Sequence, residues 1–127
     1  MSVTLADIAG INDNFSASRW SWKAAMAIIE SLDVVDESTL KMLQKGHLDI
    51  IIEKDVAKLI AAGIKQNYLA KLSEKSRVYA NLSITEDPDD GTLYKSQEDE
   101  WKNYSASKEW LESFVDFCET SEGFRIF

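Results

Sequence analysis

The feature that most restricts the fold is a nine-residue segment, Arg77–Thr85, in which apolar and polar side chains alternate. A period of two is typical of a β-strand with one buried face. The segment therefore predicts a strand and excludes an all-helical fold. It leads into residues 87–91, whose proline and glycine predict a turn. The apolar positions of the alternation are Val78, Ala80, Leu82 and Ile84.

Polar residues before the longer apolar segments indicate where helices begin. Ser16 or Ser18 can cap a helix over residues 20–32, which is apolar on most of its faces and should be well buried. Asp36 can cap a shorter second helix. Gly46 suits the carboxyl end of that helix, because glycine adopts a positive φ without strain.

Two more helices are predicted later in the chain. One begins at Asp55, and the other is capped by Ser105 or Ser107 and ended by Gly123. The apolar stripe of the first comprises Val56, Leu59, Ile60, Gly63, Ile64 and Leu72. The inner face of the second comprises Trp110, Leu111, Phe114, Val115, Phe117 and Cys118.

Two short strands complete the pattern. His47–Ile52 alternates, with Leu48, Ile50 and Ile52 on one side, and the end of the chain, residues 123–127, is largely apolar. Leaving such a tail in water would be costly, so we expect Phe124 and Ile126 to face inward and Arg125 to face solvent. The sequence therefore predicts an α+β fold, with about four helices packed on a small two- to three-stranded sheet. It predicts a single compact domain over residues 1–127.

Negative charge is concentrated in one part of the chain. The formal net charge is −8, and residues 86–100 contain seven acidic residues and one basic residue. Such a balance repels phosphate backbones, so nucleic-acid binding is not expected. The segment is either a solvated loop that maintains solubility or a surface that steers a basic protein partner. The candidate partner-binding residues are Glu86, Asp87, Asp89, Asp90, Glu98, Asp99, Glu100, Trp101 and Tyr104.

Trp101 has two interpretations. Tryptophan and tyrosine are enriched among the residues that dominate protein interfaces, so Trp101 and Tyr104 beside the carboxylates could anchor a partner. Alternatively, the Trp101 ring packs the acidic loop back onto the domain. The second interpretation is the favoured one.

Catalytic and metal-binding motifs are missing from the sequence. His47 is the only histidine and Cys118 the only cysteine. We expect His47 on the surface and Cys118 in the core. Asp87, Asp89 and Glu98 have the spacing of three calcium ligands, but the intervening residues do not fit an EF-hand loop. We therefore expect no catalytic residue, no metal and no cofactor.

Targeting signals are also missing. The first fifteen residues lack a basic segment and a continuous apolar stretch, so they do not resemble a secretory signal. No apolar run approaches the ~20 residues that span a bilayer. A free cysteine agrees with a reducing compartment. The sequence therefore predicts a cytoplasmic protein with no membrane association.

Three segments carry a resemblance to other proteins. They are the first helix with Trp20 and Trp22, the stretch through the turn at residues 83–94, and the stretch from Asn103 through Trp110 to Phe124. In these features, which are spread over most of the chain, the sequence resembles a group of small bacterial proteins with no assigned activity. The resemblance implies a bacterial, stand-alone domain and supplies no catalytic residue.

Small size, net negative charge and the lack of a catalytic constellation together favour a protein-interaction module. We expect it to act in the manner of an immunity or inhibitor protein that covers a basic toxin or nuclease. The alternative is a ligand-binding or enzymatic domain whose site is assembled from dispersed residues. The polar groups that would form such a site are His47, Tyr79, Asn81 and Arg125.

Overall fold

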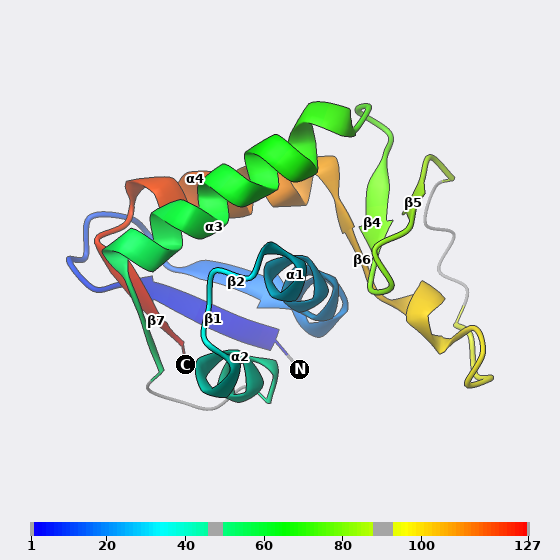
Figure 1. Cartoon of the computed structure of the whole chain (residues 1–127), viewed down its shortest axis with the longest axis horizontal. Helices are drawn as coiled ribbons and strands as arrows, with labels where there is room; N and C mark the ends of the chain where they lie inside the picture. The colour runs from blue at the N-terminus through cyan, green and yellow to red at the C-terminus, as the bar shows by residue number, and fades with distance from the viewer. Residues whose placement is uncertain (1, 46–49, 88–92, 127) are drawn as a thin grey trace.

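The computed structural model describes residues 2–45, 50–87 and 93–126 (Figure 1). The predicted α+β class with four helices is confirmed, but the strands form two antiparallel sheets, of four and three strands, where one small sheet was expected. The elements in chain order are β1 (Ser2–Asp7), β2 (Phe15–Ser18), α1 (Arg19–Leu32), α2 (Glu37–Gln44), β3 (Ile51–Glu53), α3 (Lys54–Asn67), the 3₁₀ turn η1 (Leu69–Lys71), β4 (Arg77–Tyr79), β5 (Ile84–Thr85), the 3₁₀ turn η2 (Glu100–Asn103), β6 (Ser105–Ser107), α4 (Lys108–Thr120) and β7 (Gly123–Ile126).

The larger sheet brings the two ends of the chain together. Its strand order is β2-β1-β7-β3, so the last strand lies between the first strand and β3 (Figure 1). Leu5 is paired with Ile126, and Ile52 with Phe124; all four side chains are buried. Helices α3 and α4 pack against each other, and α3 also packs against β7. The core therefore lies between this sheet face and the helices.

The predicted tail conformation is confirmed. In β7, Phe124 and Ile126 are buried and Arg125 is exposed, whereas Phe127 lies outside the described residues. Gly123 does not end the preceding helix, which stops at Thr120. Instead, Gly123 opens β7 with φ of 97°, and a Cβ there would lie 2.7 Å from the carbonyl oxygen of Ile52. Only glycine fits this close strand contact.

Three predicted helix caps are confirmed. Ser18, Asp36 and Ser107 each accept a hydrogen bond from the backbone N–H three residues further on, at 3.3, 3.1 and 3.1 Å. These bonds satisfy N–H groups that a helix leaves free at its first turn. The caps place the starts of α1, α2 and α4 where the sequence predicted them. Gly46 lies outside the described residues.

The third helix differs from its prediction in detail. It begins at Lys54 with no side-chain cap, and Leu59, assigned to its apolar stripe, is 52% exposed. Its buried residues are Ala57, Ile60, Ala61 and Ile64. Leu72 is buried but lies beyond the end of the helix. Gly63 allows a close approach to α1, because a Cβ there would lie 2.8 Å from the side chain of Leu32.

The alternating segment Arg77–Thr85 is not one strand, and this prediction is wrong. The Leu82 N–H donates to the Tyr79 carbonyl at 2.8 Å, and the Tyr79 N–H donates to the Ser83 carbonyl at 2.9 Å. Leu82 has φ of 72°, the left-handed conformation that closes a three-residue hairpin loop. The segment therefore folds back on itself as β4 and β5. Leu82 and Ile84 are 37% and 47% exposed.

The His47–Ile52 strand can be checked only in part, because residues 46–49 lie outside the described residues. Ile50 and Ile52 are buried and Ile51 is exposed, as the alternation predicted, but the strand runs over Ile51–Glu53. The turn predicted at residues 87–91 falls almost wholly on undescribed positions. Among the helices that the structure describes, none has the length and apolar character needed to cross a bilayer.

Candidate functional site

The candidate partner-binding residues lie on and beside the smaller sheet. Its strand order is β5-β4-β6, and in Figure 1 it projects at the opposite side of the molecule from β7. We call residues 77–87 and 93–107 the acidic arm. Five of the predicted acids are described there, whereas Asp89 and Asp90 lie outside the described residues. The five are Glu86, Asp87, Glu98, Asp99 and Glu100.

The arm's carboxylates are mostly without cationic partners. Asp99 is half-buried and forms an ion pair with Lys102 at 3.2 Å. Glu86, Glu98 and Glu100 are exposed and form no ion pair within the part of the chain that the structure describes. Their negative charge is therefore not neutralised by the arm itself.

Trp101 packs onto the arm rather than standing free. Its ring meets the ring of Tyr79 edge to face, with the ring centroids 5.0 Å apart, and its side chain is half-buried. An edge-to-face pair stabilises by about 0.5–1.5 kcal/mol beyond the area it buries. Trp101 therefore joins η2 to β4, as the favoured interpretation predicted.

Arg77 joins three parts of the arm. Its Nε donates to the carbonyl of Asp87 at 2.8 Å, and its two terminal nitrogens donate to Ser105 Oγ at 3.1 Å and to the Tyr79 hydroxyl at 3.0 Å. The guanidinium also lies over the Tyr79 ring, 4.8 Å from its centroid. A planar cation with several fixed donors suits this cross-bracing role.

Asn103 fixes the loop that precedes η2. Its side-chain amide accepts from the Tyr94 N–H at 2.6 Å and donates to the Tyr94 carbonyl at 2.7 Å. The amide thus satisfies both backbone groups of Tyr94, much as a neighbouring strand would. Together with the contact between Trp101 and Tyr79, this amide holds the backbone of the loop that carries Glu98 and Glu100.

Tyr104 faces a different neighbour from Trp101. Its ring stacks at a tilt on Trp20, with centroids 5.2 Å apart, and the Lys23 ammonium lies 4.2 Å from the ring centroid. Its carbonyl accepts from the Ala80 N–H at 3.0 Å. Tyr104 therefore connects the arm to α1, and the two aromatic candidates do not form one surface cluster.

The described residues of the dispersed polar site proposed as the alternative lie on different sheets. Tyr79 and Asn81 lie in the β4–β5 hairpin of the smaller sheet, whereas Arg125 is on the larger sheet. The Asn81 side chain accepts from the N–H and hydroxyl of Ser83, which stabilises the hairpin loop. His47 lies outside the described residues.

Cys118 is buried in α4, as expected. Burial raises the pKa of the Cys118 thiol, because desolvation disfavours the thiolate. The nucleophilic form is therefore disfavoured. Across residues 2–45, 50–87 and 93–126, no three histidine, cysteine or acidic side chains are arranged to hold a metal ion.

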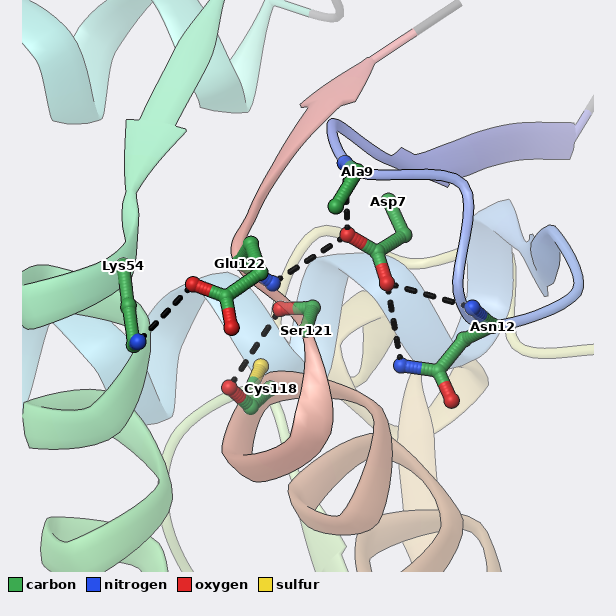
Figure 2. Close-up of polar contacts among 7 residues, drawn as sticks. All are labelled: Asp7, Ala9, Asn12, Lys54, Cys118, Ser121 and Glu122. Atoms are coloured by element: carbon green, nitrogen blue, oxygen red, sulfur yellow. Dashed lines mark hydrogen bonds and ion pairs between the residues drawn. The ribbon is translucent and has the colours of Figure 1, made fainter.

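One buried carboxylate, Asp7, was not predicted from the sequence; it is 7% exposed (Figure 2). Its Oδ1 accepts from the N–H groups of Ala9 at 3.0 Å and Glu122 at 3.1 Å. Its Oδ2 accepts from the backbone N–H and the side-chain amide of Asn12, both at 3.2 Å. Asp7 thereby ties the loop after β1 to the α4–β7 turn.

Four donors decide the charge state of Asp7. Desolvation opposes ionisation, but the hydrogen bonds from Glu122, Ala9 and Asn12 outweigh it and lower the pKa of Asp7. Both oxygens are already used by the protein. The carboxylate is therefore a structural group and not an acid–base or metal-binding one.

Comparison of the chain with protein families, curated proteins and solved structures gave no match.

Proposed function

We propose that this protein is a protein-interaction module whose acidic arm binds the cationic surface of a basic partner. The observation that carries the proposal is the combination of unneutralised carboxylates and a fixed backbone. Glu86, Glu98 and Glu100 are exposed without ion pairs in the described residues, and the contacts of Asn103 and Trp101 hold the loop that carries Glu98 and Glu100.

Both parts of that combination favour association. Exposed negative charge raises the rate at which a cationic partner arrives, because the field orients and attracts it before contact. A loop that is already ordered loses less conformational entropy when it is bound. The arm therefore suits fast recognition of a basic surface.

The finer proposal is that binding covers a basic toxin or nuclease and inhibits it. Enzymes that act on nucleic acid carry cationic surfaces that bind phosphates. An acidic surface held in a fixed geometry competes for those cations. The net charge of −8 also attracts a cationic protein.

The test uses a pair of charge-matched variants. Glu98→Gln with Glu100→Gln removes two exposed arm carboxylates, and Glu74→Gln with Glu112→Gln removes two exposed carboxylates elsewhere. A basic protein is captured from host cells with the intact chain, purified, and its dissociation constant measured against each variant. We expect the arm pair to weaken binding about tenfold more than the control pair.

Two results would overturn the proposal. One is that no basic protein is retained at low or at physiological salt. The other is that the two pairs weaken a captured partner equally, which would show that net charge matters and the arm does not. The inhibitor role would also fail if a captured nuclease kept full activity in the complex.

A further inference from the structure

A groove of about 530 Å³ is lined by residues of α1, by Gln44 at the end of α2, and by Ala80 and Tyr104 of the acidic arm. Its base is apolar and includes Trp22 and Met26, which are 5% and 3% exposed, together with Ala80 from the hairpin. The Trp22 indole N–H donates to the Leu43 carbonyl at 3.4 Å, so the ring orientation is set. Volumes of about 300–1,000 Å³ are typical of small-molecule sites.

Two cations line one end of this groove. Arg19 and Lys23 are one helical turn apart on α1 and therefore lie on the same face. Neither forms an ion pair or a side-chain hydrogen bond in the described portion of the chain, although acidic residues outnumber basic ones by 22 to 14. Both have N–H donors to offer an anion.

Aromatic rings hold these cations in place without using their donors. The Arg19 guanidinium lies 4.4 Å from the Trp20 ring centroid, and the Lys23 ammonium lies 4.2 Å from that of Tyr104. The attraction is to the negative face of the ring. Such contacts restrict a long side chain and reduce the entropy that binding would cost.

The opposite end of the groove is negative. Glu30 lies seven residues beyond Lys23 on α1, about 10 Å along the helix. Its Oε2 accepts from the Gln44 side chain at 3.4 Å. If a ligand about 10 Å long carried a second negative charge at its far end, Glu30 would therefore repel that charge.

We propose that the groove binds a small organic monocarboxylate with a flat apolar body. The carboxylate accepts hydrogen bonds from Arg19 and Lys23, and the apolar body packs against Trp22 and Met26. This site uses none of the arm's carboxylates, so it can be tested independently of the proposed protein-binding function.

The probe is 3-phenylpropanoate, titrated into the ¹⁵N-labelled full chain and followed by amide and indole N–H shifts. We expect saturable shifts at the Trp22 indole and along the groove face of α1. The uncharged 3-phenylpropanamide should bind at least about tenfold more weakly, because it offers no negative charge to the cations. The dianion 3-(4-carboxyphenyl)propanoate should also bind more weakly, because its second charge meets Glu30.

Matched variants assign the effect to the cations. Arg19→Gln with Lys23→Gln should weaken 3-phenylpropanoate binding about tenfold or more. Lys71→Gln with Lys75→Gln removes the same charge at exposed positions elsewhere and should leave binding unchanged. The proposal is overturned if millimolar 3-phenylpropanoate gives no saturable shifts, if the amide binds equally well, or if both variant pairs have the same effect.

Discussion

Replacing Asp7 with asparagine tests whether the buried carboxylate stabilises the fold through its four hydrogen bonds. The amide has nearly the same size, but one of its two ends is an NH₂ group. Whichever way it turns, two N–H donors then face another donor, either those of Ala9 and Glu122 or the two of Asn12. Hydrogen bonds to a charged group contribute about 1.5–3 kcal/mol each.

Losing two such bonds would cost about 3–6 kcal/mol. Asn12 is only half-buried, so water can replace part of the loss if the NH₂ group turns that way. We therefore expect Asp7→Asn to lower the free energy of unfolding by about 2–4 kcal/mol at pH 7. Asp13→Asn is the control, because Asp13 is exposed in the same loop and has no such contacts in the described residues.

Urea denaturation followed by tryptophan fluorescence measures both variants as a function of pH. The pKa of Asp7 is lowered on folding, so its contribution is fully present above the unfolded value of about 3.9 and is lost as pH falls through the lower folded value. The difference between wild type and Asp7→Asn should therefore be constant near neutrality and shrink below about pH 4. A variant within about 0.5 kcal/mol of wild type at pH 7, or a difference that does not change with pH, would refute the reasoning.

Three other predictions test the fold and the arm. Ile52 is 2% exposed and Ile51 is 55% exposed, so Ile52→Ala should lower the free energy of unfolding by about 2–5 kcal/mol and Ile51→Ala by less than about 1 kcal/mol. Urea denaturation measures both losses, and equal losses would contradict the β3 register. Deleting residues 124–127 removes most of a strand paired on both sides, so the protein should lose cooperative thermal unfolding, and an unchanged Tm would be inconsistent with this topology. Asn103→Ala should speed hydrogen exchange at the Tyr94 N–H by about tenfold while leaving global stability nearly unchanged; exchange at the wild-type rate would mean that the amide does not hold the loop.

The starts of α1, α2 and α4 were predictable because capping is a local interaction. Ser18, Asp36 and Ser107 each bond a backbone group three residues away, so a short stretch of sequence contains the whole signal. The inward positions of Phe124 and Ile126 were predictable for a similar reason, since alternation within β7 is enough to separate its faces.

Other features depend on contacts that the local pattern does not contain. The alternation from Arg77 to Thr85 is interrupted by a hairpin at Leu82. This residue has a positive φ but is not a glycine, so the sequence gives no sign of the turn. Strand β1 was missed because its third inward residue is Asp7, which interrupts the apolar alternation. The carboxylate is tolerated there because four N–H groups donate to it, and one of them comes from Glu122, near the other end of the chain.

The candidate site was predictable in composition and not in geometry. The concentration of acids and its neighbouring aromatics are visible in the sequence. The pairing of Trp101 with Tyr79 and of Tyr104 with Trp20 joins positions more than twenty residues apart, so it depends on the tertiary fold. The groove along α1 depends on the same contacts.

The central claim is that the arm's carboxylates attract a basic partner, and the association rate tests it most directly. Stopped-flow mixing with the captured partner, repeated over a range of ionic strength, measures that rate for wild type, for Glu98→Gln with Glu100→Gln, and for Glu74→Gln with Glu112→Gln. We predict that the wild-type rate falls steeply as salt rises, and that the arm pair is slower than the control pair at low salt and equal to it at high salt. A rate that is independent of salt, or equally slow for both variant pairs at low salt, would contradict the account.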